Sequence, residues 1–316
     1  MNLRILTAFL AVALGLATTA QAQFKHETDG AKGCKLGEDT VQRWKAGMII
    51  TAEGGPCIGL SGSAPIPFDW PEQQVTIVGE DLSPQAKLSY ETVNGTARRM
   101  QVKIDQIPAG QEVKAIITVE VRRWILLPPD KTDIYELPDK HKLEKNLRIY
   151  LAPSKLIEST NPKIKALARK IGVDKEKAWD HVEEIYDWVR AHVKYQAGPI
   201  KGALAALRDG TGDCEEVTSL FVAICRAADI PARSVWVPGH CYPEFYLVDD
   251  DGKGHWFPCQ SAGSRAFGGI PNRDPILQKG DNFKVGRESK RYLAEELTGG
   301  ASAGKPKVKF VRELVQ

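Results

Sequence analysis

The sequence predicts an α+β protein in which a β-sandwich-like module precedes a domain of helices followed by antiparallel strands. Three patterns support this fold class. Apolar and polar residues alternate between residues 87 and 121, as in half-buried strands. Apolar residues recur at helical spacing between residues 162 and 228. Two runs rich in aromatic residues, 239–247 and 255–260, flank a cluster of turn-forming residues.

Residues 1–22 predict a secretory signal peptide. A short basic start is followed by an almost wholly apolar run over residues 5–17 and by the A-x-A cleavage signal Ala20-Gln21-Ala22. That run is too short to span a membrane, and no other segment approaches 18 apolar residues, so we expect a periplasmic or secreted protein without a transmembrane segment. Cleavage removes Arg4 and changes the formal net charge from +3 to +2, a near balance that argues against nucleic acid as a partner.

Export permits disulfides among the six cysteines. Residues 23–60 form a Gly-rich segment with little apolar periodicity, and we predict that a bridge between Cys34 and Cys57 stabilises it. Cys214 and Cys225 cannot pair, because about 16 Å separates two residues at that spacing along one helix.

The next segment, residues 61–149, predicts a β-sandwich of the immunoglobulin kind. Residues 87–93 and 100–105 alternate around the turn Asn94-Gly95, and alternate residues from 113 to 121 are apolar. The charged stretch 139–145 indicates a connection to the following domain. At the other end of the chain, the tail 299–316 carries apolar residues that favour one edge strand.

Three helices are predicted next. One begins at Asn161-Pro162, and a longer one extends from about Lys175 to Val193. The third begins at Cys214, with Asp213 as its N-cap, and ends before Ile230-Pro231. Its apolar residues form one stripe at helical spacing: Val217, Leu220, Phe221, Ile224, Cys225 and Ala228.

Cys214 is the candidate nucleophile, because unpaired N–H groups and the helix dipole favour a thiolate in the first turn of a helix. His240, in the first of two predicted hairpin strands, is the candidate base. We assume a register that places His240 opposite Gln260, Cys241 opposite Cys259 and Glu244 opposite Trp256. In that register Cys241 and Cys259 can form a second disulfide, which leaves Cys214 and Cys225 free.

These segments resemble the transglutaminase-like superfamily, whose core is similar to that of papain-type cysteine proteases. The family pattern has a G-D-C helix start, a G-I-P-A-R type ending, a histidine strand H-x-W-x-E-x-Y and an aspartate strand W-x-P-x-D. The resemblance covers roughly residues 150–263 within a predicted catalytic domain at 150–298. The matching segments are Gly212-Asp213-Cys214, Asp229-Ile230-Pro231-Ala232-Arg233, His240-Cys241-Tyr242-Pro243-Glu244-Phe245-Tyr246 and Trp256-Phe257-Pro258-Cys259-Gln260.

The chain departs from this pattern at two positions. Gln260 stands where the family has its third catalytic residue, an aspartate, and Tyr242 replaces a tryptophan. We expect the Gln260 carbonyl to accept the Nδ1–H of His240 and so to orient the ring, as an asparagine does in papain-like sites. Glutamine carries no negative charge, so it supports an imidazolium less than a carboxylate does.

The chemistry that the resemblance implies is acyl transfer through a thioester on Cys214, with His240 moving the proton. The oxyanion donors are then the Cys214 N–H and, by correspondence with an upstream aromatic of the family, Tyr195. This mechanism requires no metal or organic cofactor. A calcium loop at Asp249 to Asp251 and a zinc site at Cys241, His255 and Cys259 both lack a standard spacing, so the acidic run is interpreted as a turn.

The sequence leaves three functions open. The first is an exported thiol hydrolase or acyltransferase that acts on a peptide or protein substrate, such as a cell-envelope protein. The second is a transglutaminase that crosslinks glutamine to lysine, which starts from the same thioester. The third is a catalytically silent binding module that uses the same cleft, and Gln260 favours this alternative.

Overall fold

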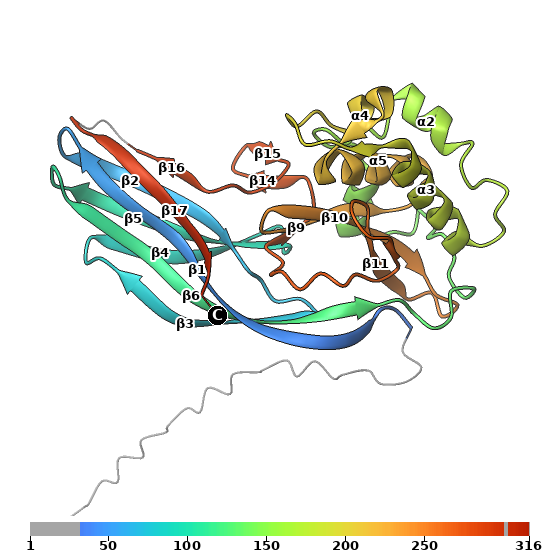
Figure 1. Ribbon diagram of the computed structural model, residues 1–316, viewed down its shortest axis with the longest axis horizontal. Helices are drawn as coiled ribbons and strands as arrows, with labels where there is room; N and C mark the ends of the chain where they lie inside the picture. The colour runs from blue at the N-terminus through green and yellow to red at the C-terminus, as the bar shows by residue number, and fades with distance from the viewer. Residues whose placement is uncertain (1–31, 300–302, 316) are drawn as a thin grey trace, which may run out of the picture.

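The computed structural model describes residues 32–299 and 303–315, so the predicted signal peptide at 1–22 lies outside the described residues. A β-sandwich occupies one end of the molecule and a group of helices packed on a sheet the other (Figure 1). No helix in the described ranges is long and apolar enough to cross a membrane. The sandwich, together with the second half of helices and antiparallel strands, confirms the α+β prediction.

The sandwich consists of two facing layers of antiparallel strands. One layer has the order β17-β1-β6-β3, and the other contains β4, β5, β2 and β16. Buried residues alternate along β6, as the sequence predicts, and pack with Met48, Ile50, Met100 and Val102 between the layers. The strands are β1 (Lys35–Glu53), β2 (Cys57–Ile66), β3 (Gln73–Leu82), β4 (Ala86–Val93), β5 (Ala97–Ile107), β6 (Glu112–Leu127), β16 (Glu296–Thr298) and β17 (Lys305–Leu314).

The predicted bridge between Cys34 and Cys57 is wrong, since both cysteines are free. The segment between them is not a loop but the 19-residue strand β1, whose length of roughly 60 Å keeps its two ends apart. Cys57 is buried in the sandwich core. Cys34 instead lies beside the second half of the molecule, where its Sγ is 3.3 Å from the carbonyl oxygen of Gly268.

The second half places helices on the strands β9, β10, β11 and β12. At its centre lies α5, which contacts both β9 and β10 and is buried along nearly its whole length. Aromatic residues from several elements fill the core around it, among them Trp179, Tyr186, Phe221 and Phe245. The elements are α1 (Lys145–Arg148), η1 (Ile149–Leu151), α2 (Pro162–Ala168), α3 (Ala178–His192), β7 (Lys194–Tyr195), α4 (Ala203–Asp209), β8 (Thr211–Gly212), α5 (Cys214–Ala227), β9 (Ala232–Val237), β10 (His240–Val248), β11 (Gly254–Gln260) and β12 (Ala266–Phe267).

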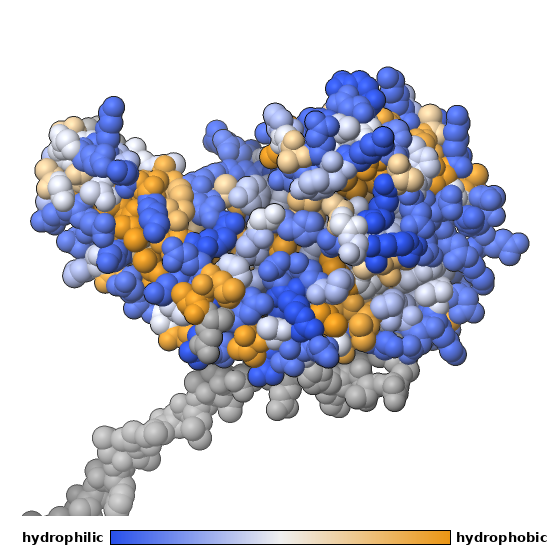
Figure 2. Space-filling model, viewed as in Figure 1, coloured by the Kyte–Doolittle hydropathy of each residue, from blue (hydrophilic) through white to orange (hydrophobic). Residues whose placement is uncertain are grey.

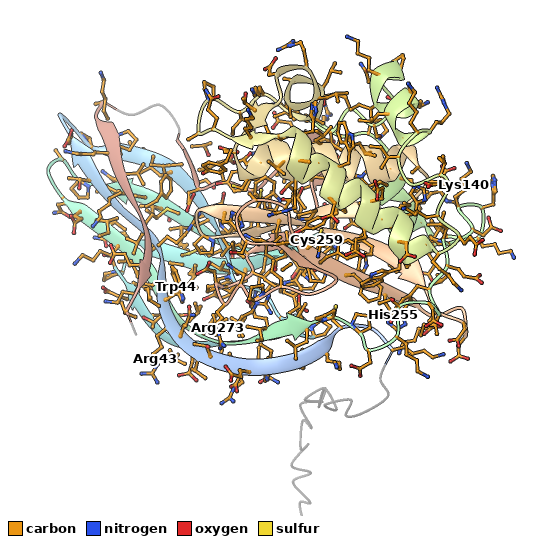
Figure 3. All side chains as sticks on the ribbon, turned by 45° about the vertical axis from the view of Figure 1, so that its right-hand side comes forward. Arg43, Trp44, Lys140, His255, Cys259 and Arg273 are labelled. Carbon is orange, nitrogen blue, oxygen red and sulfur yellow. The ribbon has the colours of Figure 1, made fainter. Side chains whose placement is uncertain are left out.

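The assumed hairpin register is wrong by two residues. Strands β10 and β11 pair Glu244 with Pro258 and Tyr246 with Trp256. This offset makes Cys241 and Cys259 diagonal neighbours, for which a Cα separation of about 7–8 Å is typical, so no direct disulfide forms between them. Both are free and buried, and Cys259 lies deep within this half (Figure 3).

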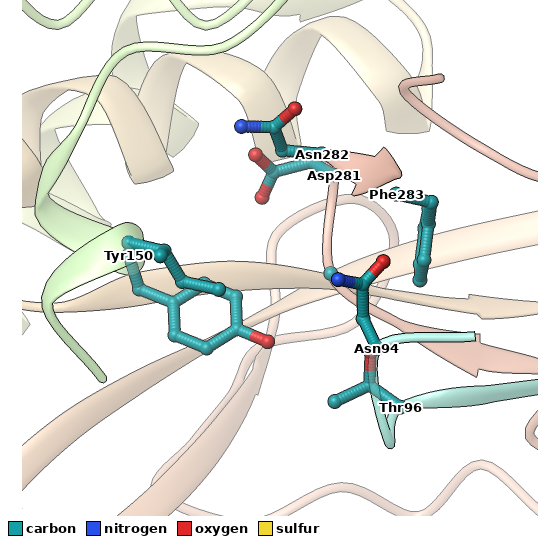
Figure 4. A pocket seen from close by; sticks show the side chains of 8 residues that line it. Asn94, Thr96, Tyr150, Asp281, Asn282 and Phe283 are labelled. Atoms are coloured by element: carbon teal, nitrogen blue, oxygen red, sulfur yellow. The ribbon is translucent and has the colours of Figure 1, made fainter. Parts of the chain in front are cut away.

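The two halves meet at β13 (Gln278–Lys279), where Gln278 pairs with Ala97 of β5 and with Trp236 of β9. The hairpin of β14 (Phe283–Val285) and β15 (Glu288–Lys290) follows. A small cavity of about 10 Å³, room for a single water, lies at this junction between Asn94, Tyr150 and Phe283 (Figure 4).

Polar residues cover most of the face in Figure 2, while apolar residues gather on the sandwich.

Candidate active site

The site begins at the N-terminus of α5, where the predicted cap is confirmed. The Asp213 carboxylate accepts a hydrogen bond from the Glu215 N–H at 2.8 Å, and the Glu216 carboxylate accepts one from the Asp213 N–H at 3.2 Å. Asp213 and Glu216 also form a reciprocal capping box, in which the side chain of each accepts the main-chain N–H of the other. A Cβ on Gly212 would lie 2.3 Å from that of Glu216, so the residue before the cap must be glycine. Cys214 therefore occupies the first helical position.

Glu216 also holds the segment ahead of the helix. Its Oε1 accepts the Lys201 N–H at 2.8 Å and the Gly202 N–H at 3.4 Å. Burial favours the neutral acid, but these bonds and that from Asp213 lower the pKa of Glu216. One buried carboxylate thus fixes both the helix start and the loop before α4.

Cys214 lies at the start of α5 and His240 at the start of β10, and the two side chains interact. Both side chains are partly exposed. Hydrogen bonds from the Cys241 thiol and from His240 lower the pKa of Cys214 to about 4, although burial acts in the opposite direction. The Cys214 thiolate in turn raises the pKa of His240 above 6.5, and the charge of Asp274 adds to this rise. These opposite shifts favour a thiolate on Cys214 beside an imidazolium on His240.

Gln260 reaches His240 in a different way from that predicted. Its amide nitrogen, not its carbonyl oxygen, lies 3.1 Å from the Nε2, not the Nδ1, of His240. The same nitrogen donates to the Ala262 carbonyl at 2.7 Å, which fixes the orientation of the amide. Its Oε1 is buried and has no hydrogen-bond partner in the described part of the chain. An NH₂ group is a donor, so this contact is a hydrogen bond only when Nε2 of the ring carries no proton and accepts.

Two residues of α3 hold the main chain at Gln260, and sequence reasoning missed both. The Tyr186 hydroxyl donates to the Gln260 carbonyl at 2.7 Å, and Arg190 Nη1 donates to it at 3.0 Å. Arg190 also binds the carbonyl oxygens of Ser261 and Gly263. The spacing of four residues, which places Tyr186 and Arg190 on one helix face, was the available signal.

Cys241 is a third residue whose place the sequence did not reveal. Its thiol lies 3.8 Å from Thr218 Oγ1 of α5, and the neighbouring Cys214 is the largest cause of its raised pKa. Thr218 Oγ1 in turn lies 3.0 Å from Ser261 Oγ, within hydrogen-bond distance. Asp274 was also missed, because it lies in a loop far along the chain from His240 and within no recognisable motif.

Tyr195 lies in β7, which pairs in parallel with β8 directly before Asp213, so its main chain is close to the start of α5. Its side chain is 68 % exposed. Its role as an oxyanion donor stays a prediction.

The acidic run forms the predicted turn. Asp249 accepts the N–H groups of Asp251 and Lys253, and its other oxygen lies 2.8 Å from His255 Nε2. Lys32 makes ion pairs with the carboxylates of Asp250 and Asp251. His255 is thus bound to Asp249 at the turn of the hairpin, whereas Cys241 and Cys259 lie toward its other end.

The sequence model of the transglutaminase-like superfamily core matches residues 165–261, the range that contains Cys214, His240 and Gln260. Residues 165–261 thus carry a transglutaminase-like core. No curated protein matches the chain in sequence.

One solved structure shares the fold over most of the chain, and a second matches more weakly. A candidate cysteine protease from Cytophaga hutchinsonii matches with a TM-score of 0.59 and 18 % identity, over 88 % of this chain and 93 % of that one. The periplasmic domain of TgpA from Pseudomonas aeruginosa, bound to ethylmercury, matches with a TM-score of 0.33 and 14 % identity, over 68 % and 89 %. The predicted resemblance is confirmed, and the first of these structures supports the fold along most of the chain.

Proposed function

We propose that this protein is a thiol-dependent hydrolase or acyltransferase that acts on amide bonds of peptides or proteins, with Cys214 as nucleophile and His240 as the acid and base. The observation that carries the proposal is the position of Cys214 in the first turn of α5, where Cys241 and His240 lower its pKa to about 4. A stable thiolate and a protonated imidazole are the two groups that such a reaction needs at its start.

In this mechanism the Cys214 thiolate attacks the amide carbonyl, and the new oxyanion is stabilised by the Cys214 N–H, which has no partner within the helix. The imidazolium of His240 gives its proton to the leaving amine, and a thioester remains. His240 then takes a proton from water or from an incoming amine, and attack on the thioester releases the product and the thiolate. Tyr195 is proposed as a second oxyanion donor.

The first test is alkylation of the purified protein by iodoacetamide across pH, followed by peptide mapping. We expect Cys214 to be labelled selectively, with a rate that rises as the pH increases through about 4, because the thiolate fraction grows over that range. His240→Ala moves this midpoint upward, and Cys214→Ala removes the label. Cys225→Ala, in the buried core, is the matched control and leaves the profile unchanged. A midpoint near 9 that is the same in the wild type and in His240→Ala contradicts the proposal.

Hydrolysis and transfer are then separated by their products. Peptide substrates are incubated with and without a lysine-like primary amine and analysed by mass. Free acids alone indicate a hydrolase, and an amide with the added amine indicates an acyltransferase or a crosslinking transglutaminase.

Gln260 favours a second candidate, a binding module without turnover. Its amide nitrogen faces His240 Nε2, and two donors oppose each other there once the ring is protonated. This candidate predicts that peptides bind to the wild type and to Cys214→Ala with equal affinity and are never cleaved.

We further propose that the protein is exported to the periplasm or secreted, on the strength of the predicted signal peptide at residues 1–22. The intact mass of protein purified from cell fractions tests this proposal. Loss of the first 22 residues in the exported fraction supports it, and an unprocessed cytoplasmic chain contradicts it.

A further inference from the structure

Cys214 and Cys241 lie beside each other, although they belong to different elements. Cys241 Sγ is 3.8 Å from Oγ1 of Thr218, which follows Cys214 by about one helical turn. Cys214 starts α5, and Cys241 is the second residue of β10, the strand that packs most closely on this helix. The two thiols also affect each other's pKa, since Cys241 lowers the pKa of Cys214 and Cys214 raises that of Cys241. Cys241 is 1 % exposed, whereas Cys214 is partly open to solvent. The pair thus combines one accessible thiolate with one protected thiol.

The arrangement does not suit a metal ion. In the described ranges, the single group of three ligand atoms lying mutually close is that of Asp249, Asp250 and Asp251. Cys214, Cys241 and His240 therefore do not converge on one point. A role for Cys241 in the acyl transfer itself is also not required, because its thiol is buried and lies 3.8 Å from Thr218 Oγ1.

We propose that Cys214 and Cys241 form a reversible disulfide when a peroxide oxidises the site, so that Cys241 is a resolving cysteine that protects the nucleophile. The inference rests on the proposed function only in requiring that Cys214 is a reactive thiolate.

The reaction balances in two steps. The Cys214 thiolate attacks one oxygen of hydrogen peroxide, the O–O bond breaks, and sulfenic acid and hydroxide form; the sulfur loses two electrons and the peroxide gains them. Hydroxide takes a proton from the imidazolium of His240 and becomes water. The Cys241 sulfur then attacks the Cys214 sulfur, an S–S bond replaces the S–O bond, and the departing hydroxide leaves with the thiol proton as water.

The site is arranged so that Cys241 becomes reactive after the first step. The neighbouring Cys214 thiolate is the largest cause of the raised pKa of Cys241, and burial adds to it. Oxidation of Cys214 to a neutral sulfenic acid removes that cause, so the fraction of Cys241 thiolate rises when it is needed. The other four cysteines lie elsewhere: Cys57 in the sandwich core, Cys225 and Cys259 in the helical core, and Cys34 beside Gly268.

The test uses the purified protein, reduced, freed of reductant and exposed to a pulse of hydrogen peroxide. Remaining thiols are blocked with iodoacetamide, and peptides are mapped with and without dithiothreitol. We expect a linked Cys214–Cys241 peptide, loss of Cys214 labelling after the pulse, and its full return after reduction. In Cys241→Ala and Cys241→Ser we expect Cys214 to proceed to sulfinic and sulfonic acid, which dithiothreitol does not reverse. Cys225→Ala is the matched control and behaves as the wild type.

Two results overturn the proposal: absence of the linked peptide from the wild type, or irreversible loss of Cys214 labelling to the same extent with and without Cys241. Mapping of the wild type decides the question even if a Cys241 variant fails to fold. The labelling rate of Cys214 before the pulse, and its dependence on His240, tests the proposed function separately. If the disulfide forms although Cys214 is labelled at the rate of an ordinary thiol and independently of His240, the proposed enzymatic function is contradicted and the proposed disulfide stands.

Discussion

At the scale of single residues, the amide of Gln260 sets the balance between the charged and neutral forms of the pair. A carboxylate at this position attracts the imidazolium, whereas the NH₂ group found here suits a ring nitrogen that accepts a hydrogen bond. The Cys214 thiolate is the main cause of the raised pKa of His240, and the uncharged Gln260 and the charge of Asp274 add smaller contributions. The pair is therefore more sensitive to alkaline pH than one with a third carboxylate.

Gln260→Glu tests this argument. We expect the new negative charge to raise the pKa of His240 by about 1–3 units, because an opposite charge at hydrogen-bond distance favours the protonated ring. The alkaline limb of any activity profile, where His240 loses its proton, moves upward by the same amount. Titration of the His240 ring protons by NMR measures the shift directly. Gln260→Ala removes the amide without adding charge and serves as the control, and an equal shift in both variants contradicts the argument.

At the scale of elements, the sequence predicted what is local and missed what depends on distant partners. The helix at Cys214 and its cap were predictable because Asp213, the apolar stripe and Pro231 lie within one short stretch. The strand β1 was missed because its partners, β6 and β17, are far along the chain. The place of Cys241 beside the start of α5 depends on how β10 packs on that helix, which strand patterns do not show.

Glu216 joins two elements, so its loss is expected to affect both. Glu216→Ala removes the acceptor for the N–H groups of Lys201, Gly202 and Asp213, and we expect a loss of about 1–3 kcal/mol in the free energy of unfolding. Urea unfolding followed by circular dichroism measures it. Glu176→Ala, an exposed residue ahead of α3, is the control and is expected to change little. A loss no larger than that of the control would show that the capping box is dispensable.

At the scale of the whole molecule, a buried group of charges connects the sandwich to the transglutaminase-like domain. Lys279 of β13 lies between the carboxylates of Glu72, beside the sandwich, and Glu244 of β10, with both Nζ–Oε1 distances at 2.6 Å. Arg233 of β9 holds the other oxygen of Glu244 at 2.7 Å. All four side chains are less than a tenth exposed. The strand that carries His240 is thus tied electrostatically to the other half.

Lys279→Met is expected to destabilise the protein by about 3–5 kcal/mol, because it leaves Glu72 and Glu244 buried without their shared cation. Lys307→Met, which removes an exposed ion pair with Glu53, is the control and is expected to cost less than about 1 kcal/mol. Urea unfolding at neutral pH compares the two, and equal losses would contradict a role for the buried group.

The same group predicts how stability depends on acid. Burial raises the pKa of Glu72, but Lys279 and Arg123 outweigh it and hold the pKa at about 2, below the ordinary 4.5. A carboxyl with a depressed pKa in the folded state contributes stability that is fully present above 4.5 and is lost as the pH falls through about 2. Glu72→Gln removes this contribution, so its unfolding free energy should fall less steeply over that interval than that of the wild type. Equal slopes of unfolding free energy against pH for the two proteins would mean that other groups cause the acid sensitivity. A flatter slope in the variant would show that acid weakens the junction between the halves.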